Sequence, residues 1–127
     1  MIWGIIITLA IIAVKVWYDY YHPVLHTKEW WYMAIASTPA IYLFTQASAL
    51  PWYFAAPLSA AMISFFIWLM FDGVYNLVRG FNWWFTGSND PDDAKTDNFL
   101  QGLKLWQHVV IKIGGLALFV TLYILTK

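Results

Sequence analysis

Charged residues are absent from a long central stretch of the chain. No Asp, Glu, Lys or Arg occurs in residues 30–71, a run of 42. A helix crosses about 30 Å of hydrocarbon with about 20 residues, so this run is twice as long as one crossing needs. Polar residues around Gln46 and then Pro51 interrupt the apolar pattern, and proline favours the start of a helix. The pattern therefore predicts two membrane spans, at 30–45 and 51–71, joined by a tight uncharged turn.

Both ends of the chain carry shorter apolar stretches. The first is uncharged as far as Lys15, and the last is uncharged from the residue after Lys112 almost to the C-terminus. A lysine near the end of a helix can extend its side chain toward the headgroups, which lengthens the usable span. The sequence thus predicts two further spans, at 1–18 and 109–126. The first lacks the basic leader and the small-residue cleavage site of a signal peptide. We therefore expect a single membrane domain over 1–127.

Composition supports a membrane protein. The chain is 61% hydrophobic and 11% charged, with zero net charge, whereas soluble domains carry about 25% charged residues. Zero net charge argues against a nucleic-acid partner. The absence of cysteine excludes disulfides, thiolate metal sites and cysteine nucleophiles. The expected fold class is all-α: a polytopic protein with four transmembrane helices and the lipid bilayer as its surroundings.

Basic residues fall almost entirely on one side of such a four-span arrangement. Both termini and the turn before Pro51 share one side, and the polar segment 72–108 lies on the other. Lys127 is the only basic residue on the side of the termini. The basic residues on the other side are Lys15, Lys28, Arg79, Lys95, Lys104 and Lys112. Basic residues near span ends favour the cytoplasmic side, so we expect both termini outside an inner or plasma membrane.

Tryptophans cluster near the predicted span ends on the same side. They are Trp17, Trp30, Trp31, Trp83, Trp84 and Trp106. Amphipathic rings favour the headgroup level of a bilayer, which predicts an interfacial aromatic belt. The alternative interpretation is an aromatic cage for a cation.

A weak metal-binding pattern occurs in the first loop. His22 and His26 are four residues apart and Glu29 follows three residues later, a set that could hold zinc or iron on a continuous helix. Pro23 favours a helix start at that point, which takes His22 off the regular face. The preferred interpretation is a hydrated turn, with no metal and no cofactor.

One polar stripe follows the third predicted span. Asp72, Asn76 and Arg79 lie within about 60° of one another on a helix that continues beyond Phe71. Ionisable residues at the membrane boundary that face a bundle are candidates for function. Two interpretations stay open: structural pairing with other helices or backbone groups, or a site for a lipid headgroup.

The residues before the last span predict an amphipathic helix lying on the membrane. Asp90 and Pro91 are typical of a helix start, and from Phe99 onward one side is apolar and the other carries lysines and His108. This pattern predicts an interfacial helix that leads into the last span. His108 is accordingly expected at the headgroups.

Small residues point to association between helices. Ala56 and Ala60 are four residues apart, and Gly114 and Gly115 allow close helix approach or a kink. The favoured function is therefore that of a non-enzymatic component, homo-oligomeric or part of a membrane complex, with pore-forming or lysis-type activity as one form of it. The alternative is an enzyme or binding protein that acts on a lipid headgroup through the polar stripe. A transporter is less favoured because the spans lack an acidic residue near the bilayer midplane.

Overall fold

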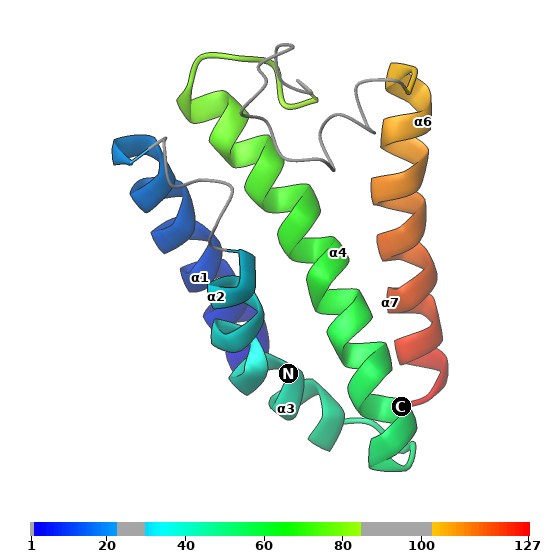
Figure 1. Ribbon diagram of the computed structural model, residues 1–127. Coiled ribbons are helices and arrows are strands. Elements are labelled where there is room, and N and C mark those ends of the chain that lie inside the picture. Colours follow the sequence, from blue (N-terminus) through cyan, green and yellow to red (C-terminus); the bar gives the residue numbers. More distant parts are fainter. Residues whose placement is uncertain (1, 23–29, 85–102) are drawn as a thin grey trace.

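The protein is built from helices throughout its described part. The computed structural model describes residues 2–22, 30–84 and 103–127, with the backbone alone for residues 30 and 31. The predicted all-α class is confirmed for these residues. The elements are α1 (Ile2–Tyr21), α2 (Trp30–Ala36), α3 (Thr38–Gln46), α4 (Trp52–Val78), α6 (Leu105–Val109), the π-helical turn η2 (Val110–Gly114) and α7 (Gly115–Leu125) (Figure 1).

Three helical segments are long and apolar enough to cross a membrane. They are Ile2–Tyr21, Trp52–Val78 and the continuous run Leu105–Leu125. They coincide with the first, third and last predicted spans, although each extends beyond the predicted bounds. The third begins directly after Pro51, as the proline position predicts. A membrane association thus rests on three helices of sufficient length and hydropathy.

The second predicted span, 30–45, is not one regular helix. It is divided into α2 and α3 at Ser37. Pro39 lacks the N–H that a continuous helix needs at this point. The Ser37 hydroxyl also donates to the Met33 carbonyl at 2.6 Å, a bond that tends to bend helices. Backbone bonds from Ser37 N to Met33 O and from Ile41 N to Ser37 O, both 2.9 Å, bridge the break. The segment is therefore a kinked helix in two pieces.

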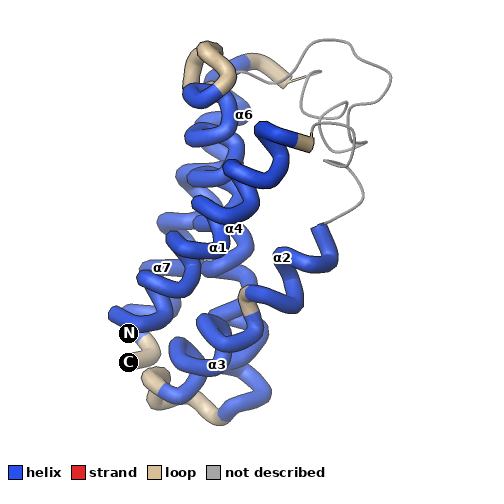
Figure 2. Tube along the Cα trace, turned by 90° about the vertical axis from the view of Figure 1, so that its left-hand side faces the viewer, coloured by secondary structure: helices blue, strands red, loops and turns tan. Residues whose placement is uncertain are grey.

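The two termini and the turn between α3 and α4 lie at one end of the molecule (Figures 1 and 2). Phe44 of α3 holds this end together. Its carbonyl accepts a hydrogen bond of 2.8 Å from the Tyr123 hydroxyl, and its ring lies against Gly4, where an added Cβ would come within 2.8 Å. The Ala49 amide donates to the Thr126 carbonyl at 3.0 Å. Both α1 and α4 consequently begin at the same end.

The core lies around α4, which contacts α1, α3 and α7. Its buried apolar side chains are Ile12, Val16, Met33, Ala40, Phe44, Met62, Ile63, Ile67, Phe71, Tyr75 and Tyr123. Gly115 allows α7 to approach α4 closely, because an added Cβ would lie 2.3 Å from the Phe65 ring. Of the two roles that the sequence left open for the paired glycines, close approach or a kink, Gly115 takes close approach, whereas a Cβ added at Gly114 would meet nothing within 4 Å among the described residues.

The helix α4 continues beyond Phe71, as the polar stripe requires, and ends in a left-handed turn. Gly80 has φ +80°, a conformation that glycine adopts without a steric penalty. The Phe81 amide donates to the Asn76 carbonyl and the Gly80 amide to the Leu77 carbonyl, the two bonds of a Schellman motif. The returning chain then lays the Trp83 ring over Gly73.

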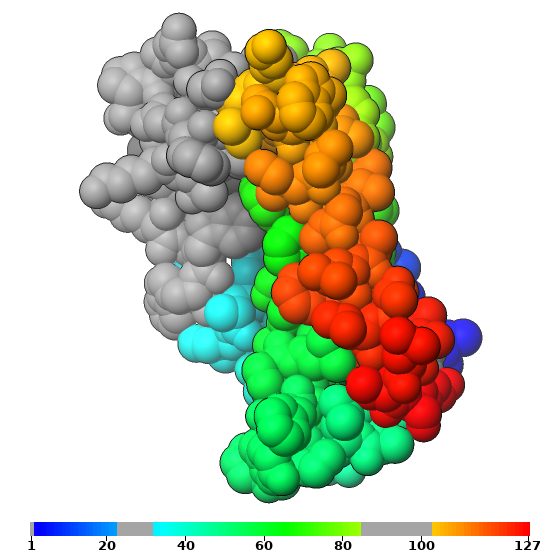
Figure 3. Space-filling model, turned by 90° about the vertical axis from the view of Figure 1, so that its right-hand side faces the viewer, coloured from blue at the N-terminus to red at the C-terminus, as the bar shows by residue number. Residues whose placement is uncertain are grey.

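The last helix lies along the outside of α4 (Figure 3). In its first turns, α6 and η2, the apolar side chains face outward and the polar side chains face the bundle. Trp106 and Val110 are exposed, whereas His108 and Lys112 are buried. In lipid, a polar helix face turns toward the bundle and an apolar face turns outward. His108 therefore faces the interior of the bundle and not an exposed polar surface, and its position at the headgroups stays a prediction. The predicted residues 99–102 lie outside the described part.

Candidate functional site

An ion pair lies within the last two turns of α1. Lys15 pairs with Asp19 four residues later, and the Asp19 side chain is 0% exposed. The Lys15 ammonium also lies over the Phe71 ring of α4, 5.8 Å from its centroid. An aromatic face attracts a cation most strongly where water is excluded. The pair therefore contributes to the contact between α1 and α4.

A second ion pair joins α4 to the last helix. Lys112 in the π-helical turn pairs with Asp72, and its ammonium lies 4.9 Å from the centroid of the Trp68 ring. Isolated π-helical turns are rare and occur frequently at functional sites, because they shift side chains relative to the surrounding helix. Here the turn carries the one lysine of α6, η2 and α7.

The two ion pairs meet α4 at two adjacent residues, Phe71 and Asp72, and lie on opposite sides of this helix. Phe71 contacts Lys15 on the α1 side, and Asp72 contacts Lys112 on the other side. Lys15 lies 13 residues after Ile2, and Lys112 lies 13 residues before Leu125. Both lysines are therefore about 20 Å along their helices from the end of the molecule that holds the termini. We call Lys15, Asp19, Asp72 and Lys112 the charged layer. Its two pairs are each electrically neutral.

The polar stripe predicted from the sequence is divided among three sets of contacts. Asp72 pairs with Lys112, and the Asn76 amide donates to the Trp83 carbonyl at 3.1 Å. Arg79 is exposed at the end of α4, where its guanidinium lies 5.3 Å from the Tyr75 ring and 5.2 Å from the Phe81 ring. Asp72 and Asn76 therefore have partners from other parts of the fold, while Arg79 contacts the nearby Tyr75 and Phe81 rings and stays exposed.

The weak metal candidates are only partly described. His22 is exposed, its ring stacks on Tyr18 at 4.6 Å, and its Nδ1 lies 3.1 Å from the Tyr18 carbonyl oxygen. His26 and Glu29 lie outside the described residues. Within the described ranges there is no group of three or more His, Cys, Asp or Glu side chains that could hold a metal ion.

The predicted interfacial tryptophans differ in exposure. Trp17 and Trp106 are more than 60% exposed, whereas Trp83 is half-buried against Gly73. Trp84 is half-buried as well, and the side chains of Trp30 and Trp31 lie outside the description.

Exposed tryptophans also occur at the terminus end, which the sequence interpretation missed. Trp3 is 68% exposed and Trp52 is 73% exposed. Their positions at the starts of two apolar helices were a usable signal, since interfacial tryptophans occur at both sides of a bilayer.

Only one of the two ion pairs in the charged layer could be predicted from the sequence. Lys15 and Asp19 are four residues apart, a spacing that brings side chains together on one helix. Asp72 and Lys112 are separated by 40 residues, so no local pattern predicts their contact. Comparison with protein-family models, curated proteins and solved structures finds no match for this chain.

Proposed function

We propose that the chain is an integral membrane protein with four crossings, the kinked α2–α3 segment being the second. Support comes from the directions of the helices, because α1 and α4 both start at the terminus end. A chain that crosses in α1 and again in α4 in the same direction must return between them. Residues 30–46 comprise 17 residues, the lower limit for a spanning helix. The basic residues at the other end favour a cytoplasmic position for that end, in an inner or plasma membrane.

The biochemical role that we propose is non-enzymatic assembly of this chain with further copies through α7. One observation carries it: in Gly115–Leu125 the only buried residue is Tyr123, whereas α4 has nine buried residues. The outward face includes Gly114, Ala117 and Thr121, all exposed. An added Cβ at Gly114 would meet nothing within 4 Å among the described residues. Small residues on a free helix face let two membrane helices approach closely.

The pairing inside the charged layer favours assembly over a pore or a lysis-type activity. Lys15 with Asp19 and Lys112 with Asp72 satisfy each other within one chain. A water-filled channel needs polar side chains on the face that lines it, whereas the exposed face of α7 is mostly apolar. Exposed tryptophans at both ends would anchor the assembly at the two headgroup regions.

Disulfide crosslinking in native membranes tests the assembly. Because the natural chain has no cysteine, Ala117→Cys introduces a single thiol on the outward face of α7. Oxidation should give a band of twice the monomer mass. Ala13→Cys, at an exposed alanine of α1, is the matched control and should stay monomeric. A second variant, Thr121→Cys, places the thiol one turn further along the same exposed face. Equal crosslinking of Ala117→Cys and Ala13→Cys, or no crosslinking of either Ala117→Cys or Thr121→Cys, contradicts assembly through α7.

A second candidate function is the binding of an anionic lipid headgroup, and it now rests on Arg79. This side chain is exposed between two aromatic rings, which hold a guanidinium in place for a phosphate. Native mass spectrometry with phosphatidylglycerol tests it. Retention of phosphatidylglycerol should fall in Arg79→Gln. It should persist in Arg79→Lys if the positive charge alone binds the lipid. Unchanged retention in Arg79→Gln excludes this role.

A further inference from the structure

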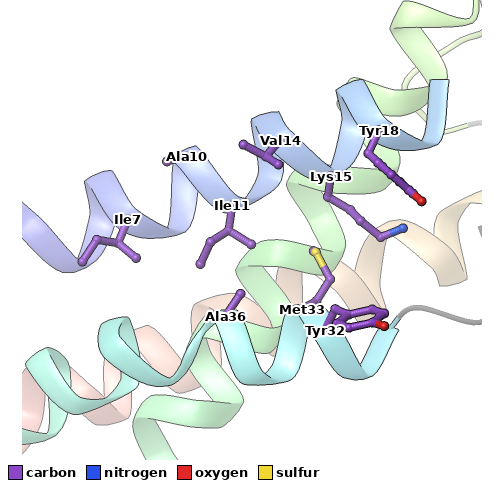
Figure 4. A pocket seen from close by; sticks show the side chains of 9 residues that line it. All are labelled: Ile7, Ala10, Ile11, Val14, Lys15, Tyr18, Tyr32, Met33 and Ala36. Carbon is purple, nitrogen blue, oxygen red and sulfur yellow. The ribbon is translucent and has the colours of Figure 1, made fainter. Parts of the chain in front are cut away.

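A groove of about 610 Å³ runs between α1 and α2 (Figure 4). Its walls are aliphatic over most of its length, from Ile7 to Val14 on α1 and at Ala36 on α2. An apolar groove between two membrane helices is filled by apolar matter, since an empty space loses packing contacts. The identity of the occupant therefore depends on the polar end of the groove.

Three polar side chains gather at that end. Lys15 and Tyr18 belong to the last two turns of α1, and Tyr32 lies in the first turn of α2. In Figure 4 the Lys15 amine and the two phenol groups all lie at the same end of the groove, away from Ile7. The groove is consequently amphiphilic, with an aliphatic length and one polar end that carries an amine and two hydroxyls.

The length of the groove matches one leaflet. Ile7 and Tyr18 are 11 residues apart on α1, which corresponds to about 16 Å along the helix axis. Half of a hydrocarbon core of about 30 Å is about 15 Å. An acyl chain of a membrane lipid therefore fits along the groove with its polar linkage near the last turns of α1.

Charge decides which polar group fits. Lys15 is already neutralised by Asp19, whose side chain is fully buried. A further anion would give the site a net negative charge in a medium of low dielectric constant, which is strongly unfavourable. Phenol hydroxyls donate hydrogen bonds to neutral acceptors. The polar end therefore suits an uncharged carbonyl rather than a carboxylate.

We propose that this groove binds one ester-linked acyl chain of a membrane glycerolipid, whose ester carbonyl accepts hydrogen bonds at Tyr18 and Tyr32. The proposal requires membrane insertion, but it does not require assembly through α7. Failure of the Ala117→Cys crosslink leaves it intact, and failure of lipid retention leaves the assembly intact. The two proposals are therefore distinguished by separate measurements.

The test uses two lipids that differ only in their linkage. The purified full-length protein is depleted of lipid, exposed to diester or diether phosphatidylcholine of equal chain length, and examined by native mass spectrometry. We expect a one-to-one adduct that is retained about five- to a hundredfold better for the diester, the range of two neutral hydrogen bonds. Equal retention of the two lipids overturns the proposal, as does stronger retention of oleate than of the diester.

Variants locate the adduct. Ala36→Trp fills the groove and should abolish retention, whereas Ala34→Trp, at an exposed alanine of the same helix that does not line the groove, should leave it unchanged. Ala10→Trp with Ala13→Trp as its control repeats the comparison on α1 in case the first variant does not fold.

Tyrosine variants test the polar end. Tyr18→Phe and Tyr32→Phe should each reduce the preference for diester, and Tyr20→Phe, which does not line the groove, should not. Full retention in both groove-filling variants, or an unchanged diester preference in both Tyr18→Phe and Tyr32→Phe, contradicts the site.

Discussion

Lys112 in the π-helical turn of the last helix pairs with Asp72 on α4, 40 residues earlier in the chain. The lysine side chain is 8% exposed and the aspartate side chain 24%. The pair holds the last helix against α4, in the half of these helices that is away from the two termini. Each partner therefore makes the other tolerable in an apolar setting, because an isolated charge there is costly.

The Asp72–Lys112 pair should behave as a coupled unit in a double-mutant cycle. We expect Asp72→Asn and Lys112→Met each to lower the free energy of unfolding by about 2 kcal/mol. This is below the usual loss for a fully buried pair because Asp72 keeps some solvent contact. The double variant should recover most of that loss, since no unpaired charge remains. Thermal unfolding in detergent micelles measures all three variants, with Lys104→Met as an exposed control. Additive losses would contradict the pairing.

Asp19 should be more sensitive than Asp72. Its side chain is 0% exposed against 24% for Asp72, whereas the two lysines are about equally buried, at 9% and 8%. Water can therefore replace the Asp72 carboxylate beside Lys112 more readily than it can replace the Asp19 carboxylate beside Lys15. We expect a loss of about 3 kcal/mol, which lies within the range for a broken buried pair. The same unfolding measurement compares the two variants. A smaller loss for Asp19→Asn than for Asp72→Asn would show that burial does not set the cost.

The two adjacent glycines of the last helix should respond differently to alanine. Gly115→Ala forces the Phe65 ring to move, because the new Cβ would lie 2.3 Å from it. That ring is already in contact with Trp68 and Phe119. Overpacking of this kind costs about 1–3 kcal/mol. Gly114→Ala meets no described atom of its own chain within 4 Å and should cause no loss of stability in the monomer. Equal melting temperatures for the two variants would argue against close packing of Gly115 on Phe65.

Sequence reasoning located the apolar helices well because their signal is local. A run of uncharged residues and a proline at position 51 are enough to place the start of α4. The kink at Ser37 also has a local cause in Pro39. The predicted span at 30–45 was based on hydropathy alone, which does not detect such a break. The local signals thus placed the helices better than they described their shape.

Contacts between distant residues were beyond the sequence. The direction in which His108 and Lys112 point depends on whether the surroundings are lipid or water, and the amphipathic pattern is the same in both cases. Asp72 and Asn76 lie on α4 and Arg79 follows its last residue. The partners of Asp72 and Asn76, however, come from Lys112 and from a chain reversal at Gly80. These contacts are made by packing between elements that are far apart in the chain, so no local sequence pattern predicts them.

Cysteine accessibility in intact cells tests the four-crossing arrangement most directly. Ala49, in the turn between α3 and α4, and Asn82, beyond the end of α4, are both exposed. A membrane-impermeant maleimide should label Ala49→Cys in intact cells, and it should label Asn82→Cys only after the membrane is permeabilised. Labelling of both positions in intact cells would show that α4 does not cross the membrane, and labelling of Asn82→Cys alone would reverse the orientation; either result contradicts the proposed arrangement.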